Sequence, residues 1–391
     1  MRLFPCLPNL FAAALGVLAP WALAQQQVPA IVVQQSANRA TPIALTGFTP
    51  EVRRILEFDL TVVGFEVVAG DKAQYIASSV PAAEFAGALR DGISNQDLFR
   101  RQYPGGGLRA QAHALADDIA KALNHGSGLS RKKIAFKKKA AKGSEIFVAD
   151  FDGANSVQMT SDGSDVAAPA WVPGQLTLFY TSYRLSNPDI YSHNLTTGTR
   201  VTVARYTGSN ISPAPSPDGS RVAMVLSKSG SPDLWVAAAD GSSPRQLTRS
   251  KEDESSPCWS PDGRRICFTS RMEGRPALYT ISSTGGTPQR LDIGGITGAT
   301  EPDWSPDGKW ISFTRSSGGT FQICVVPAAG GETKTLREGE DASWGPNSRT
   351  LVFVRRLGGG QRTLSLLDVP TGRVKDWVSV SGSCSQPSWA R

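Results

Sequence analysis

The sequence predicts a mainly β protein in which a six-bladed β-propeller follows a small N-terminal α/β domain. Three observations predict this architecture. A short phrase, Trp-Ser-Pro-Asp-Gly in its fullest form, returns at a nearly constant distance. Each return is followed by apolar stretches of strand length that end in glycine turns. Residues 25–129 lack the phrase and instead carry the apolar spacing of helices.

The repeats align on a tryptophan at the end of the first strand of each unit. The spacings between successive copies are 44, 44, 45, 40 and 45 residues, and one copy has proline in place of tryptophan. A period of 40–45 residues with four strands is typical of a propeller blade. The aligned positions are Trp171, Pro215, Trp259, Trp304, Trp344 and Trp389.

Turn chemistry explains the repeated phrase. Proline presets φ at the second position of a turn, and glycine adopts the conformation that leaves it. The first unit, from Lys133 to Thr160, lacks a Pro-x-Trp strand, whereas the chain ends on one in residues 386–391. We therefore expect the C-terminal strand to complete the first blade, so that residues 130–391 form a closed ring without an open sheet edge.

Residues 25–129 alternate between strand and helix patterns. Pro42–Phe48 has the composition of a strand, and apolar residues at helical spacing follow over residues 50–64. A second stripe runs from Leu108 to Leu123 and stops before Gly126. These features predict a small α/β domain.

The first 24 residues have the layout of a secretory signal peptide. An arginine precedes an apolar run from Leu10 to Leu23, and the small-residue sequence Ala22-Leu23-Ala24 predicts cleavage between Ala24 and Gln25. We expect an exported protein. Cys258, Cys267, Cys324 and Cys384 would then remain. An oxidising compartment permits disulfides, and Cys258 and Cys267 flank one turn, but buried single thiols are an equal alternative.

Together the two parts resemble the TolB family of periplasmic propeller proteins, with TolB/WD40-like repeats. The resemblance covers the order of the domains, the six repeats, the segment AIVVQQSANRATPIALTGF and the segment QDLFRRQYPGGGLRAQAHALADDIAKAL. It implies an adaptor of the Tol–Pal envelope system that supports outer-membrane integrity and constriction during cell division. Pro215 and the sequence Gly345-Pro346-Asn347-Ser348 depart from the repeat, so a TolB-like paralogue with another envelope partner is an alternative.

The resemblance also implies two protein partners. The propeller would bind the peptidoglycan-associated lipoprotein Pal, through residues that precede each Pro-x-Trp and that we expect to ring the channel entrance. The N-terminal segment, residues 25–40, would bind the C-terminal domain of TolA, with Ile31, Val32 and Val33 as an apolar grip suited to strand addition. We expect a monomer in the free state. The candidate Pal-binding residues are Ser209, Ser212, Ser255, Glu301 and Asp341.

Catalysis is the competing class, because peptidases join similar propellers to hydrolase domains. Such a domain needs a Gly-x-Ser-x-Gly nucleophile elbow and a later histidine, yet the sequence has no such pentapeptide and no histidine beyond His193. Three widely spaced histidines do not suggest a metal site, and Asp150, Asp152, Asp240 and Asp368 fall in or beside turns. We expect no enzyme activity, no metal and no cofactor.

A basic cluster opens the first blade, where seven lysines and arginines fall within residues 131–142. Such clusters can bind nucleic acid or anionic lipid headgroups. Export and the lack of a stacking array of aromatic residues argue against nucleic acid. The cluster is therefore either a solvated loop or a peripheral contact with an anionic membrane surface.

Overall fold

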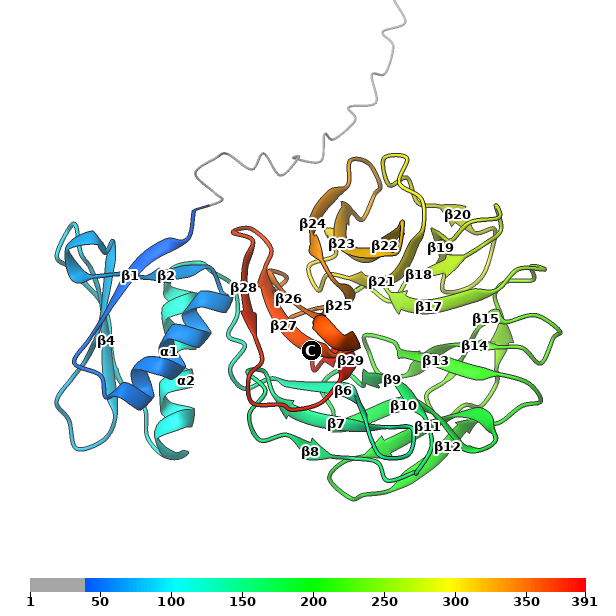
Figure 1. Ribbon diagram of the computed structural model, residues 1–391, viewed down its shortest axis with the longest axis horizontal. Helices are drawn as coiled ribbons and strands as arrows, with labels where there is room; N and C mark the ends of the chain where they lie inside the picture. The colour runs from blue at the N-terminus through cyan, green and yellow to red at the C-terminus, as the bar shows by residue number, and fades with distance from the viewer. Residues whose placement is uncertain (1–38) are drawn as a thin grey trace, which may run out of the picture.

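The computed structural model describes residues 39–391, which form an N-terminal α/β domain and a six-bladed β-propeller (Figure 1). This confirms the predicted fold class. The candidate cleavage site at Ala24–Gln25 and the apolar grip Ile31–Val33 lie outside the described residues. Within those residues, no helix combines the length and apolar character needed to cross a membrane.

The N-terminal domain is a five-stranded sheet with two helices on one face. Strand β1 lies parallel to both β2 and β3, and β3, β4 and β5 continue as an antiparallel meander. A 3₁₀ turn, Gly70–Lys72, precedes β3. The elements are β1 (Thr41–Thr46), α1 (Pro50–Val62), β2 (Phe65–Val67), β3 (Tyr75–Ser79), β4 (Ala86–Asp91), β5 (Asp97–Gln102) and α2 (Gly107–Ala122).

Local chemistry explains where helix α1 begins. The Thr49 hydroxyl accepts a hydrogen bond from the Val52 backbone N–H, Pro50 stands at the first helical position, and Glu51 lies in the first turn. Each of these features favours a helix start, because the first N–H groups lack partners inside the helix and carry partial positive charge. The buried residues of α1 recur at helical spacing, from Val52 to Leu60.

Every blade is a four-stranded antiparallel sheet. The first three blades, in chain order and from the channel outward, consist of β29 (Cys384–Trp389), β6 (Lys133–Lys139), β7 (Ser144–Asp150) and β8 (Val157–Gln158); β9 (Val166–Trp171), β10 (Thr177–Leu185), β11 (Asn187–Asn194) and β12 (Arg200–Ala204); and β13 (Asn210–Pro215), β14 (Arg221–Leu226), β15 (Asp233–Ala238) and β16 (Arg245–Gln246).

The remaining blades repeat the pattern, with a 3₁₀ turn at Gly358–Gly360 in blade 6. They consist of β17 (Glu254–Trp259), β18 (Arg265–Ser270), β19 (Ala277–Ser282) and β20 (Gln289–Arg290); β21 (Ala299–Trp304), β22 (Trp310–Ser317), β23 (Thr320–Pro327) and β24 (Lys334–Glu338); and β25 (Glu340–Trp344), β26 (Thr350–Arg356), β27 (Arg362–Asp368) and β28 (Arg373–Asp376).

The ring closes as predicted, because the last strand of the chain joins the first blade. Strand β29 pairs with β6 in antiparallel register, with Trp389 opposite Ile134 and Cys384 opposite Lys138. The Ser-Pro-Asp-Gly turns follow the innermost strands. In all three of these turns the serine hydroxyl donates to the aspartate carboxylate and accepts from the backbone of the next strand, which fixes the hairpin; the serines are Ser216, Ser260 and Ser305.

The two domains share one hydrophobic core. Helices α1 and α2 lie between the N-terminal sheet and the propeller (Figure 1), where the Phe58 ring meets the Phe151 ring of blade 1 at 5.9 Å between centroids. The buried Thr350 hydroxyl of blade 6 donates to the Val62 carbonyl at the end of α1, at 2.9 Å. This packing joins the N-terminal domain to the seam between the last blade and the first.

A buried ionisable pair lies within this shared core. The Nδ1 atom of His113 on α2 is 2.6 Å from the Asp59 carboxylate on α1. Burial raises the pKa of Asp59 to about 6, against the opposing effect of His113. The Phe151 ring stands edge-on to the imidazole, so the pair is covered by blade 1.

Tryptophans at the ends of the innermost strands fill the wedges between blades. Trp304 is 1% exposed and packs with apolar residues of blades 4 and 5. Removing its indole should leave a cavity that the rigid strands cannot close. We expect Trp304→Ala to lower the free energy of unfolding by about 3–5 kcal/mol, measured by urea denaturation.

The matched control is Val378→Ala, because Val378 is 94% exposed. That substitution should change the free energy of unfolding by no more than about 0.5 kcal/mol. Equal stabilities of the two variants would show that the wedge tryptophans are not major contributors to propeller stability.

Candidate functional site: the propeller channel

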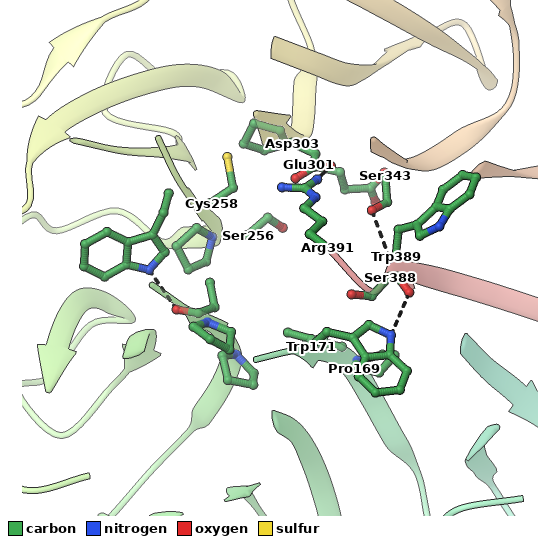
Figure 2. Close-up of a pocket in the computed structure, with 18 of the residues that line it drawn as sticks. Pro169, Trp171, Ser256, Cys258, Glu301, Asp303, Ser343, Ser388, Trp389 and Arg391 are labelled. Atoms are coloured by element: carbon green, nitrogen blue, oxygen red, sulfur yellow. Dashed lines mark hydrogen bonds and ion pairs between the residues drawn. The ribbon is translucent and has the colours of Figure 1, made fainter. Parts of the chain in front are cut away.

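A cavity of about 470 Å³ occupies the propeller channel and is lined by all six innermost strands. Figure 2 shows its wall, with Pro169 and Trp171 of blade 2 across from Glu301 and Asp303 of blade 5. Much of the wall is proline. One set precedes the ends of the innermost strands (Pro169, Pro213, Pro257, Pro302 and Pro387) and a second set belongs to the turns that follow (Pro173, Pro217, Pro261 and Pro306).

Each innermost strand contains a β-bulge three residues before its aligned tryptophan or proline. In β17, for example, Ser256 and Pro257 together stand opposite Phe268 alone, because Ser255 pairs with Thr269 and Cys258 pairs with Cys267. A bulge bends its strand and redirects the extra side chain. Proline fits there because a bulged residue leaves the hydrogen-bonded ladder.

The first residue of every bulge has a left-handed backbone. The φ values of these six residues lie between 49° and 55°, and none of them is glycine. Such residues are uncommon, and a conformation of this kind costs on the order of 1–3 kcal/mol at each position. Because this conformation recurs at the same point in all six blades, it is a regular feature of the channel wall and not an isolated irregularity. The six residues, here called the bulge ring, are Ala168, Ser212, Ser256, Glu301, Asp341 and Gln386.

Three side chains of the bulge ring connect four neighbouring blades, from blade 5 through blades 6 and 1 to blade 2. The Glu301 carboxylate accepts from the Asp341 backbone N–H at 3.1 Å, and the Asp341 carboxylate accepts from the Gln386 N–H at 3.1 Å. The Gln386 amide oxygen then accepts from the Ala168 N–H at 3.0 Å. Each long side chain therefore satisfies a backbone donor of the next blade. The Thr314 hydroxyl also donates to Glu301, at 2.7 Å.

The other half of the bulge ring is made of small residues. Ala168, Ser212 and Ser256 cannot span to the next blade, and the Ser212 N–H instead donates to the Thr181 hydroxyl at 3.2 Å. The cavity is consequently asymmetric. At the bulge ring, blades 2–4 present short side chains, and blades 5, 6 and 1 present the longer polar side chains of Glu301, Asp341 and Gln386.

An ion pair lies on the polar side of the cavity. The Arg391 guanidinium contacts the Asp303 carboxylate (Figure 2). It also donates to the backbone carbonyls of Trp304 and Trp344, at 3.2 and 3.3 Å. Asp303 also accepts from the Trp344 N–H at 2.7 Å. Burial raises the pKa of Asp303, while Arg391 opposes that effect. Arg391 thus joins the last strand to blades 5 and 6.

The structure places the five candidate partner-binding residues in two groups. Ser212, Glu301 and Asp341 line the cavity, as expected for residues that ring it. Ser209 and Ser255 do not line it: Ser209 lies before β13, where its N–H donates to Ser227, and Ser255 pairs with Thr269 one residue before the bulge. Both serines therefore precede the cavity wall, and their part in partner binding stays a prediction.

Sequence reasoning missed Ser256, Ala168 and Gln386 as members of the bulge ring. The signal was present, because each stands three residues before an aligned tryptophan and directly before a proline.

The basic cluster also differs from the expected loop. Its lysines from Lys133 to Lys139 lie on strand β6, where Lys138 stands over the Phe147 ring and Lys137 lies 3.9 Å from Asp165.

Within residues 39–391, no three histidine, cysteine, aspartate or glutamate side chains are grouped so that they could hold a metal ion.

The fold and the channel define a class of protein. It is a closed six-bladed propeller with an asymmetric central cavity lined by prolines, and a second domain packs where the last blade meets the first.

Comparison with known proteins identifies the family. The family described as TolB beta propeller domain matches residues 121–391, and the chain belongs to that family. The Tol-Pal system protein TolB of Anaeromyxobacter sp. (strain K) is 30% identical over 276 residues, which cover 60% of this chain and 63% of the relative. A protein TolB homolog of Chlorobaculum tepidum is 33% identical over 158 residues, or 40% of this chain and 36% of the relative.

The fold has a solved counterpart. The crystal structure of TolB from Acinetobacter baumannii superposes with a TM-score of 0.80 at 24% sequence identity, over 90% of this chain and 97% of the other. At that identity the likeness concerns the fold, and it extends over both domains. The matched region spans less than two thirds of the length of the Anaeromyxobacter relative.

The carboxyl groups of the bulge ring predict a pH effect. Burial and the neighbouring Glu301 carboxylate raise the pKa of Asp341 well above its usual range. The folded protein therefore holds a proton that the unfolded chain releases near pH 4. The associated stability is lost as pH rises from about 4 through the raised pKa. Asp341→Asn should increase the free energy of unfolding at pH 8 by on the order of 1 kcal/mol.

The measurement is urea denaturation of Asp341→Asn and the unsubstituted protein at pH 5 and pH 8. Asp240→Asn is the control, because hydrogen bonds from Ser242 lower the pKa of that exposed carboxyl. It should leave stability at pH 8 unchanged or slightly reduced. A loss of stability at pH 8 in Asp341→Asn would contradict the prediction, since asparagine can still accept from Gln386.

Proposed function

We propose that this protein is a periplasmic adaptor of the Tol–Pal system, which binds folded partner proteins and does not catalyse a reaction. The observation that carries the proposal is the bulge ring: six strained, inward-turned residues around one cavity, in a chain of the TolB family. Backbone strain of this kind persists only where the surrounding structure holds it in place, and strained residues cluster at active sites and ligand-binding sites. A cavity walled by proline offers a rigid surface that loses little entropy when a partner docks.

The partner of the propeller is a Pal-like peptidoglycan-associated lipoprotein. The small side chains of Ala168, Ser212 and Ser256 leave room on one side of the cavity, while Glu301 and Asp341 supply acceptors on the other. A loop of the partner would enter from the bulge-ring side. Ser209 and Ser255, which precede the bulges in β13 and β17, would contact the same partner outside the cavity.

The N-terminal segment, residues 25–40, serves the second partner. It would bind the C-terminal domain of TolA by adding a strand to that domain's sheet edge, with Ile31, Val32 and Val33 as the apolar contacts. Two partners on two parts of one chain would link the inner-membrane and outer-membrane components. In this role the protein supports outer-membrane integrity and constriction during cell division.

A bulky residue at Ser212 should block the propeller partner. Ser212 lines the open side of the cavity, and its side chain makes no hydrogen bond to the next blade. We expect Ser212→Trp to reduce capture of a Pal-like lipoprotein at least tenfold in a pull-down from detergent-solubilised envelope. The melting temperature should change little, because the new side chain can occupy the cavity.

The matched control is Thr196→Trp, which places the same bulk on the exposed β11–β12 turn, away from the channel. It should capture the lipoprotein as well as the unsubstituted protein. Full capture by Ser212→Trp would exclude the channel as the docking site, and loss of capture by both variants would point to a non-specific effect of tryptophan.

Deletion of residues 25–36 tests the second partner. Ordering about a dozen residues on binding costs entropy, so the affinity for the TolA C-terminal domain should be micromolar and not nanomolar. Titration calorimetry should show this binding with the intact mature chain and none with the truncated one. The truncated chain should still capture the Pal-like lipoprotein, and TolA binding at unchanged affinity would refute the strand-addition mechanism.

A further inference from the structure

Blade 4 contains two cysteines that face each other on neighbouring strands. Cys258 on β17 pairs directly with Cys267 on β18, immediately after the bulge. Residues opposite each other in an antiparallel pair project to the same face of the sheet. Both cysteines accordingly belong to one apolar cluster, together with Trp304 in the wedge between blades 4 and 5.

Strand geometry brings these thiols within bonding range. Directly paired residues in an antiparallel sheet have Cα atoms about 4.5–5.5 Å apart, and disulfides form at about 4.4–6.8 Å. All four cysteines of the described residues are free thiols in the structure. Cys324 and Cys384 lie on the separate strands β23 and β29, neither of them paired with another cysteine.

The same position in the other blades sets this pair apart. The residues equivalent to Cys258 and Cys267 are Ala214 and Ala223 in blade 3, and Asp303 and Ser312 in blade 5. In the described propeller only blade 4 has a thiol on both strands at this point. Blade 3 has the same register with small residues, so it provides an internal test of the geometry.

We propose that Cys258 and Cys267 are a modification site: a thiol pair that oxidises to a disulfide between the first two strands of blade 4. The oxidant is a disulfide such as oxidised glutathione. The Cys258 thiolate attacks one glutathione sulfur and releases reduced glutathione. The Cys267 thiolate then attacks Cys258 of the mixed disulfide and releases the second glutathione. The two cysteines lose two electrons and two protons, and the oxidant gains them.

Access and acidity set the conditions for this reaction. Cys258 lines the channel cavity and is 9% exposed, whereas Cys267 is fully buried, so the first attack belongs to Cys258. Burial and the neighbouring thiol raise the pKa of Cys258 well above its usual range. Few thiolates form in the folded state, and exchange there is slow. The bond forms most readily while the blade is assembling.

The experiment refolds the protein from urea in buffers of varied reduced-to-oxidised glutathione ratio. Acid quenching and alkylation with N-ethylmaleimide then trap the remaining thiols. Arg264 and Arg265 separate the two cysteines, so trypsin yields linked peptides only if the bond has formed. We expect linked Cys258 and Cys267 peptides to dominate the oxidised protein, with Cys324 and Cys384 alkylated.

The blade 3 equivalent is the matched control. Ala214→Cys with Ala223→Cys, in a chain that also carries Cys258→Ala and Cys267→Ala, should form the corresponding linked peptides at similar ratios. The oxidised natural protein should also unfold at a higher urea concentration than its reduced form. Alkylation of Cys258 and Cys267 at every ratio, or pairing of either with Cys324 or Cys384, would overturn the proposal whatever the control shows.

Discussion

The pairing of β29 with β6 is the contact on which the remaining structure depends. It joins residues 384–389 to residues 133–139 and removes the two sheet edges that an open array of blades would expose. The cavity exists because the innermost strands surround one axis, and that arrangement requires closure. Arg391 strengthens the join beyond β29 itself, since its guanidinium contacts blades 5 and 6.

The N-terminal domain packs on the seam between blade 6 and blade 1, where the ring closes. Trp389 and Ile134, which pair across the closing strands, belong to the core cluster that includes helices α1 and α2. A change that loosens the closure would therefore disturb the domain junction, and undocking of the helices would uncover the closing strands. The α/β domain and the closed propeller thus depend on the same contacts.

Closure leaves the cavity with unlike walls. Glu301, Asp341 and Gln386 use their side chains to hold neighbouring blades together, so their acceptors are partly occupied by the fold. The short side chains of Ser212 and Ser256 do not hold the next blade in this way. The polar side of the bulge ring therefore contributes side-chain hydrogen bonds between blades that the small-residue side does not.

Much of the fold follows from the sequence, because it rests on repetition. The constant spacing predicts the blades, and the displaced Pro-x-Trp strand predicts closure. The bulges, in contrast, do not follow from the spacing of the repeats. A run such as Glu254–Trp259 fits an ordinary strand. The proline before the aligned tryptophan marks the position, but the extra residue is established by the pairing on both sides of Ser256 and Pro257. For this reason the sequence pointed to Ser255, one residue before the bulge, and not to Ser256. Side-chain links between blades, such as Glu301 to Asp341, depend on distances that spacing along the chain does not contain.

The position of the closing strand also orders the folding of the protein. Five blades consist of strands that are consecutive in sequence, so each can form from local contacts as soon as its strands are available. Blade 1 instead needs a strand that lies about 250 positions further along the chain. Contacts between residues so far apart form slowly, because closing the long intervening loop costs conformational entropy. Until they form, β6 has a bare edge and the shared core lacks Trp389. The newly made chain is therefore most exposed to misassembly and aggregation at its first blade, which is completed last.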